Sequence, residues 1–86
     1  MNIRMYYLDF VEEQVLLFPQ NYKILSVASR NGYPVLWVMI DESLPKIECV
    51  ISVVTERANI ENIFSFIGTI QDRYNSYYHV FEKLKE

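Results

Sequence analysis

The sequence predicts a mainly β fold, either a small antiparallel β-sandwich or a partly closed barrel of about six or seven strands, with at most one short helix. Three observations lead to this class. Short runs rich in Val, Ile, Tyr and Phe recur along the chain, turn-forming residues separate these runs, and no long segment repeats its apolar residues with a helical period. Because a chain of 86 residues buries only about 60 to 65% of its unfolded surface, we expect a single β-rich domain over residues 1–86. An α+β layout with one short helix is the alternative.

The clearest local signal is Asn31-Gly32, since these residues tolerate the positive φ that a two-residue type I′ turn requires at both centres. The resulting hairpin register pairs Arg30 with Tyr33, Ala28 with Val35, Val27 with Leu36, Ser26 with Trp37 and Leu25 with Val38. One face of the hairpin then carries Leu25, Val27, Leu36 and Val38. Trp37, on the other face opposite small residues, is expected in the core, with a role at an interface as the second reading. Pro34 falls on a non-hydrogen-bonded pair, so its missing N–H removes no ladder bond.

Five further strands are expected from apolar runs at residues 3–8, 14–18, 47–55, 63–70 and 77–81. A single helical turn through Glu61-Asn62 is compatible with the break before the strand at 63–70. A longer helix from Asn59 or from Tyr77 onward is the weaker alternative, because Tyr, Ile, Phe and Val dominate both segments and favour strands. Gly68 stands inside a predicted strand, where a glycine marks a bulge or a place where a large side chain crosses the sheet.

The chain carries one histidine, His79, and one cysteine, Cys49. A Ser-His or Cys-His catalytic site needs a histidine beside its nucleophile, and His79 has no such partner in its apolar segment. A structural zinc site needs about four Cys or His ligands, and neither Gly32 nor Gly68 belongs to a phosphate-binding loop. We therefore expect no enzymatic activity, no catalytic residue, no metal and no cofactor. Cys49 is expected to be a buried, inert thiol and His79 a satisfied strand histidine.

The formal net charge of −3 and the scattered basic residues disfavour direct binding of nucleic acid, which needs basic patches. No apolar run reaches the roughly 18 residues of a membrane span, and the first residues lack the pattern of a signal peptide. The sequence therefore predicts a cytoplasmic protein that does not act at a membrane.

Tyrosine is frequent, with seven residues in the chain. Tyrosine and arginine are enriched among the hot-spot residues of protein interfaces, and several of these tyrosines fall in or beside predicted turns. The residues predicted to contact a partner are Tyr33, Arg30, Arg73, Tyr74 and Tyr77. The alternative is that they are ordinary strand and turn aromatics with their neighbouring arginines.

Several short motifs, in the same order and spacing, make the chain resemble a family of small uncharacterised proteins from bacteriophages and prophages. The motifs are Lys-Ile-Leu-Ser-Val at residues 23–27, Asn31-Gly32 followed by Leu36-Trp37 and Asp41, Ile-Gly-Thr at residues 67–69 and His-Val-Phe-Glu at residues 79–82. The chain departs from that family at Glu56-Arg57, where members carry a Gly-Thr-Gly-like turn, and at residues 71–76, which contain no glycine. The resemblance implies a phage setting and a compact β-rich fold, without an established activity.

From these features we expect a small phage-type accessory protein that binds a protein of its bacterial host in the host cytoplasm, with inhibition of a host defence factor as the expected effect. One alternative is an acidic mimic of nucleic acid, in which phosphates are imitated by Glu12, Glu13, Asp41, Glu42, Glu48 and Glu56. Another is a virion or assembly component whose exposed sheet edges pair with copies of itself. A weak homodimer is compatible with each of these functions.

Overall fold

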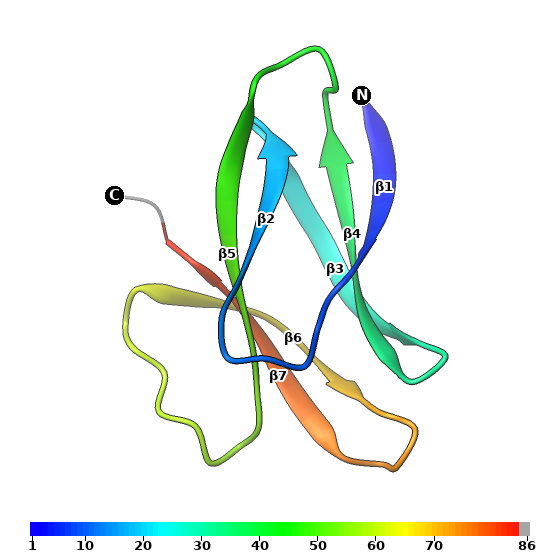
Figure 1. The fold of residues 1–86 in the computed structure, drawn as a ribbon, viewed down its shortest axis with the longest axis vertical. Helices are drawn as coiled ribbons and strands as arrows, with labels where there is room; N and C mark the ends of the chain where they lie inside the picture. The colour runs from blue at the N-terminus through cyan, green and yellow to red at the C-terminus, as the bar shows by residue number, and fades with distance from the viewer. Residues whose placement is uncertain (85–86) are drawn as a thin grey trace.

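The computed structural model describes residues 1–84, which form seven strands and no helix (Figure 1). The strands are β1 (Asn2–Tyr7), β2 (Gln14–Pro19), β3 (Lys23–Arg30), β4 (Tyr33–Ile40), β5 (Lys46–Val54), β6 (Phe64–Gln71) and β7 (Tyr77–Lys83). Three of them make an antiparallel sheet in the order β1-β4-β3, here sheet A, and four make sheet B in the order β2-β5-β7-β6. The predicted antiparallel all-β fold is therefore confirmed.

The helical alternatives are wrong for the described residues. A turn at Asn62-Ile63 takes the place of the single helical turn, and the segment from Tyr77 onward is a strand. The reason is that Tyr78 and Val80 alternate with His79 and face the interior, a period of two that only a strand provides. Nothing in residues 1–84 forms a helix of the length and apolarity that a membrane crossing requires.

The core lies between the two sheets and consists of side chains that alternate along the strands. Its buried members are Leu8, Phe18, Leu36, Val38, Ile40, Cys49, Ile51, Val53, Ile70 and Val80. Full burial of an aliphatic or phenyl side chain of this kind contributes about 1.5–3 kcal/mol. The ring of Phe18 on β2 packs edge-on against Tyr6 of β1 at 4.7 Å and against Tyr22 at 5.0 Å between ring centroids, so aromatic contacts join the two sheets on this side.

The hairpin of β3 and β4 follows the predicted register from its turn as far as Ser26 and Trp37. Asn31 and Gly32 have φ values of 53° and 81°, as a type I′ turn requires. The predicted pairing of Leu25 with Val38 is wrong, because a β-bulge intervenes and Ile24 pairs with Val38 instead. The extra residue shifts the alternation, so that Ile24 packs against the core while Leu25 is 42% exposed.

Trp37 does not lie in the core, contrary to the expectation. It is opposite Ser26, as predicted, but on the outer face of sheet A, and 36% of it is exposed. The inner positions of β4 are filled by Leu36 and Val38, which are completely buried. Because neighbouring strand residues point to opposite faces, Trp37 must face away from sheet B.

Gly68 lies at a bulge, the first of the two predicted alternatives, and it also lies where the two sheets approach closely. The register of β6 shifts between Phe66 and Gly68, and a Cβ atom added to Gly68 would lie 2.7 Å from Cγ1 of Val27 on β3. The edge strands β3 and β6 therefore pack closely, and the two sheets meet along them.

Candidate partner-binding surface

Three connecting segments that are far apart in the sequence meet at one end of the molecule: the β1–β2 loop, the β3–β4 turn and the β6–β7 turn. The two turns lie side by side at the lower right of Figure 1. Together the segments line a cavity of about 250 Å³. We refer to this region as the tip surface, and its residues are Phe10, Gly32, Tyr33, Asp72, Arg73 and Tyr74.

Asp72 builds the turn that presents Tyr74. Its carboxylate oxygen Oδ1 accepts hydrogen bonds from the backbone N–H groups of Tyr74 at 2.8 Å and Ser76 at 2.9 Å, and its own N–H donates to the Ser76 carbonyl at 2.9 Å. Asn75 closes the turn with a φ of 65°, a left-handed conformation that asparagine tolerates well. The result is a hydrogen-bonded turn from which the Tyr74 side chain projects, with 79% of the residue exposed.

Arg73 connects the two turns. Its guanidinium carbon lies 5.3 Å from the centre of the Tyr33 ring, within the range of a cation–π contact, and its Nη2 donates to the Asn31 carbonyl at 3.3 Å. A Cβ atom on Gly32 would come within 3.0 Å of the Arg73 side chain, so glycine is needed here for the close approach as well as for its positive φ. Within residues 1–84 the single ion pair joins Arg4 and Glu42, so Arg73 has no carboxylate partner among them.

Phe10 forms the third wall of the tip surface, and the sequence analysis did not select it. Its ring centroid lies 6.4 Å from that of Tyr33 and 4.6 Å from that of Tyr78. One local signal could have indicated it: Phe10 and Val11 are apolar residues in an acidic corner that also contains Asp9 and Glu12. Such a pair in a polar loop needs a surface to pack against, and here the end of the sandwich provides it for Phe10.

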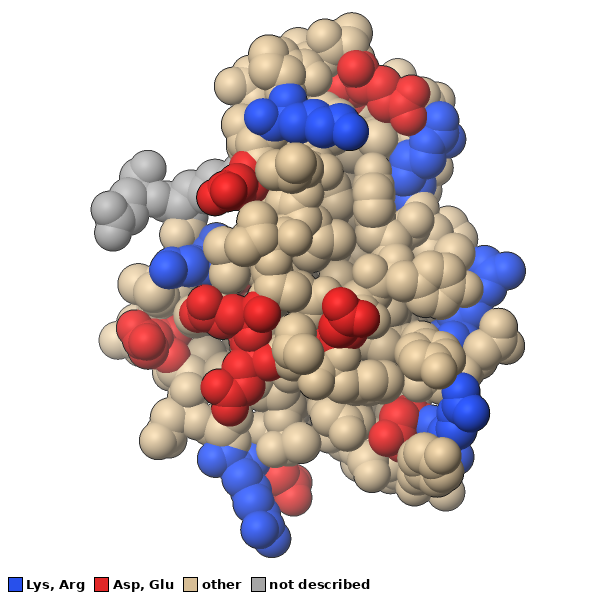
Figure 2. All heavy atoms as spheres, in the orientation of Figure 1, with Lys and Arg blue, Asp and Glu red and all other residues tan. Residues whose placement is uncertain are grey.

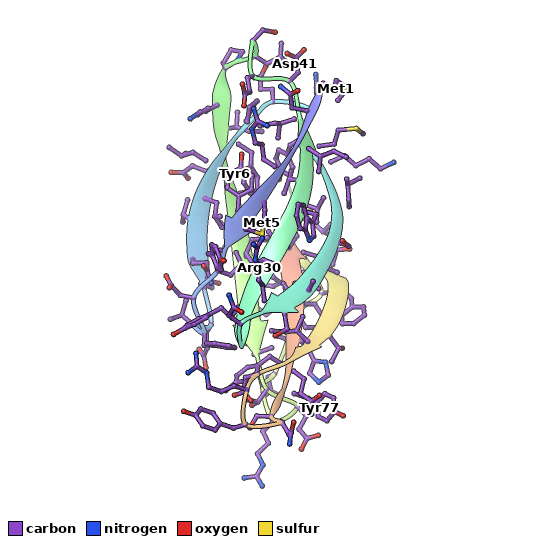
Figure 3. The ribbon with its side chains drawn as sticks, turned by 90° about the vertical axis from the view of Figure 1, so that its right-hand side faces the viewer. Met1, Met5, Tyr6, Arg30, Asp41 and Tyr77 are labelled. Atoms are coloured by element: carbon purple, nitrogen blue, oxygen red, sulfur yellow. The ribbon has the colours of Figure 1, made fainter. Side chains whose placement is uncertain are left out.

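Three of the five predicted contact residues come together at this site, namely Tyr33, Arg73 and Tyr74. Arg30 does not join them: its Nη1 lies 3.3 Å from the Met5 sulfur on the outer face of sheet A, where Figure 3 labels both residues side by side. Tyr77, which is 61% exposed, pairs with Gln71 in sheet B and does not line the cavity.

A family model described as a domain of unknown function, DUF7352, matches residues 1–86. The chain belongs to the DUF7352 family. No curated protein and no solved structure matches it. The DUF7352 description contains no activity and no source, so in this DUF7352 chain the tip surface has to be judged on its geometry alone.

A second notable surface of the DUF7352 chain is the outer face of sheet A. The registers of β1 and β3 against β4 place a set of mostly apolar side chains on this face: Ile3, Met5, Tyr7, Ala28, Val35, Trp37 and Met39. Figure 3 views the molecule from this side. Val35 is buried beneath its neighbours, whereas Ile3 and Tyr7 are more than half exposed. Within residues 1–84 no strand covers this face, and apolar surfaces of this kind are typical of contact sites.

Cys49 is buried, as predicted, but it belongs to a polar network. The Tyr22 hydroxyl donates to Glu82 Oε2, and the Cys49 sulfur lies 3.6 Å from the same oxygen. The pKa of Tyr22 is raised well above its usual range. Burial is the largest cause, and the hydrogen bonds with Cys49 and Glu82 raise it further. The network borders an open cavity of about 860 Å³ between the starts of β3 and β6. Residues 1–84 contain no group of three or more potential metal ligands.

The only histidine, His79, lies on β7, and its Nδ1 is 2.9 Å from the Thr69 hydroxyl on β6. Thr69 and His79 are directly opposite each other in the sheet, so the hydroxyl is a cross-strand neighbour of the ring. This is the environment of a satisfied strand histidine, as the sequence predicted.

The acidic residues do not form one continuous row. Glu12, Glu13 and Glu61 surround a cavity of about 370 Å³, whereas Glu42 pairs with Arg4 at 3.0 Å on another part of the surface. Hydrogen bonds from the Ser43 hydroxyl and backbone N–H lower the pKa of Asp41. In Figure 2 several acidic side chains gather near the middle of the face shown, whereas the basic side chains lie mostly around its margin.

Proposed function

We propose that the protein is a binding module that recognises another protein through the tip surface. The observation that supports this proposal is the cavity between Phe10, Tyr33 and Arg73, with Tyr74 projecting beside it. A volume of about 250 Å³ is below the roughly 300–1,000 Å³ of pockets for drug-sized ligands. It suits a single inserted side chain, the way in which hot-spot residues of one protein enter pockets of another.

The tip surface is also held in place before a partner arrives. The hydrogen bonds of Asp72 define one turn, the positive φ values of Asn31 and Gly32 define the other, and Arg73 joins them. A preorganised surface loses less conformational entropy on binding than a flexible loop, and affinity rises accordingly.

The charge on this surface suggests the chemistry of the partner. The Arg73 guanidinium is positive and has no carboxylate partner within residues 1–84, so an Asp or Glu of the partner is the expected complement. An apolar side chain next to that carboxylate would fill the cavity beside Phe10 and Tyr33. The resemblance to phage proteins makes a protein of the bacterial host the expected partner, in the host cytoplasm, with inhibition of a defence factor as the expected effect.

Two matched tyrosine variants test this proposal. The wild-type chain, Tyr74→Ala and Tyr77→Ala are each immobilised and exposed to the same bacterial lysate, and the retained proteins are identified by mass spectrometry. We expect one protein to be retained by the wild type and by Tyr77→Ala and to be lost with Tyr74→Ala, because only Tyr74 belongs to the tip surface.

Arg73→Ala should lose the same protein. If no protein distinguishes the wild type from Tyr74→Ala and Arg73→Ala, while far-ultraviolet circular dichroism shows that all variants are folded, the tip surface is not the binding site and the proposal fails.

A further inference from the structure

Strand β1 forms a free edge of sheet A. It pairs with β4 on one side from Asn2 to Tyr7 without a register shift, and no strand within residues 1–84 lies beside it on the other side. In Figure 1 it lies at the upper right of the molecule. A strand with one unpaired side presents a row of N–H and C=O groups that another strand can use.

The hydrogen-bond pattern identifies which groups these are. The Leu8 N–H donates to the Pro34 carbonyl at 2.9 Å, which makes Leu8 and Pro34 a bonded pair. Because bonded pairs alternate along an antiparallel ladder, the next one is Tyr6 with Leu36, followed by Arg4 with Val38. The backbone groups of the residues between them, Ile3, Met5 and Tyr7, therefore point away from β4.

The side chains of these same three residues lie on the uncovered outer face of sheet A, beside Trp37 and Met39. A strand added to β1 would thus gain main-chain hydrogen bonds and apolar contacts together. This combination is the basis of recognition by strand addition.

The other edge strands are protected in ways that β1 is not. The bond from the Gln20 N–H to the Pro45 carbonyl at 2.8 Å places Pro19 with its missing N–H toward the free side of β2, where a proline blocks pairing. Strands β3 and β6 each contain a bulge, and they pack against each other. Strand β1 has neither a proline nor a bulge.

We propose that a second copy of this chain pairs with β1 in an antiparallel arrangement centred on Met5, so that the two copies share one continuous sheet. The sequence of β1 is complementary to itself in this register. Met5 faces Met5 of the second copy, Ile3 faces its Tyr7, and Arg4 faces its Tyr6. The only charged side chain of β1 is therefore opposite an aromatic ring and not opposite a like charge, which would be destabilising.

The pairing would also cover part of the apolar face. Ile3 is 56% exposed and Tyr7 is 53% exposed. In the dimer, Ile3 of each copy would contact Tyr7 of the other copy. This inference goes beyond the proposed function and uses a different surface, because none of the three residues belongs to the tip surface.

The mass of the wild-type chain in solution is the first test. Light scattering after size exclusion, over a series of concentrations, should show a shift from the chain mass of 10.3 kDa to twice that value. Ile3→Lys should remove the shift, whereas Leu17→Lys should keep it. The two positions are matched, since both are on edge strands and both residues are 56% exposed. A wild-type chain that stays at 10.3 kDa at the highest concentration overturns the proposal.

A charge exchange at Met5 tests the register itself. Met5→Lys alone and Met5→Glu alone should each be monomeric, because each would place two like charges opposite each other. An equal mixture of the two variants should regain the dimer mass, which also shows that both variants are folded. A mixture that stays monomeric, or single variants that dimerise as the wild type does, contradicts pairing centred on Met5.

Discussion

The close crossing at Gly68 gives the sharpest test of how the two sheets meet. Alanine at this position would place its Cβ atom 2.7 Å from Cγ1 of Val27, well inside the contact distance of two carbon atoms. Inserting a methyl group into a packed site costs about 1–3 kcal/mol. Replacing glycine by alanine also stabilises the folded state by roughly 0.4–1 kcal/mol, because it lowers the conformational entropy of the unfolded chain. We expect Gly68→Ala to lower the free energy of unfolding by about 1–2 kcal/mol.

For a domain of this size, a loss of 1 kcal/mol lowers the melting temperature by roughly 4–8 °C, so a decrease of about 5–15 °C is expected. Urea unfolding followed by the fluorescence of Trp37 and by circular dichroism measures the same change as a free energy. Ser65→Ala, at an exposed position of the same strand, is the control and should change the stability by less than about 0.5 kcal/mol.

A double substitution identifies the cause of the loss. Val27→Ala alone should cost about 1 kcal/mol for its partly buried methyl groups. In the presence of Val27→Ala the atom that clashes with residue 68 is gone, so the double variant should be about as stable as Val27→Ala alone. If the two losses add, or if Gly68→Ala is more stable than the wild type, the close contact between β3 and β6 is not as the structure has it.

Three further predictions concern the core, the bulge and the buried network. Phe18→Ala should cost about 3–5 kcal/mol, because the Phe18 side chain is completely buried, whereas Leu17→Ala should cost less than about 1 kcal/mol in the same urea titration. Leu25→Ser should leave the free energy of unfolding within about 0.5 kcal/mol of the wild type. A loss of several kcal/mol would contradict the bulge and would indicate that Leu25 pairs with Val38 inside the core. The raised pKa of Tyr22 means that its proton is held more tightly in the folded chain. The contribution of this proton to the free energy of unfolding is complete below the usual tyrosine pKa of about 10 and is lost as the pH rises above it. Between about pH 10 and 11 the free energy of unfolding of Tyr22→Phe should therefore fall less than that of the wild type.

The positions of the strands follow from local chemistry, and the sequence analysis predicted them closely. The expected strand at 47–55 corresponds to β5 (Lys46–Val54), and the turn at Asn31-Gly32 has the predicted backbone conformation. Alternation with a period of two, β-branched composition and turn residues with positive φ are properties of neighbouring residues. They can be recognised without knowing which strands meet. The bulge at Gly68 can also be recognised locally, since an isolated glycine inside a strand often marks a bulge or a close approach of another segment.

Prediction failed where the outcome depends on partners that are distant in the sequence. Leu25 and Trp37 are as apolar as the core residues around them, and only the bulge and the packing of sheet B on the other side of β4 place them outside. Phe10 lines the tip surface because the order of the strands brings the β1–β2 loop to the ends of two hairpins.

The sequence by itself determined the seven strands and the tightest turn. The tertiary structure alone decided which aromatic residues share the tip surface, that Arg30 and Tyr77 lie apart from it, and that β1 keeps an unpaired edge. The physical reason is that strand propensity is set by residues next to one another. Exposure is set by which strands lie side by side and by which face of a sheet packs against the other sheet, and both depend on contacts between residues that are distant in the sequence.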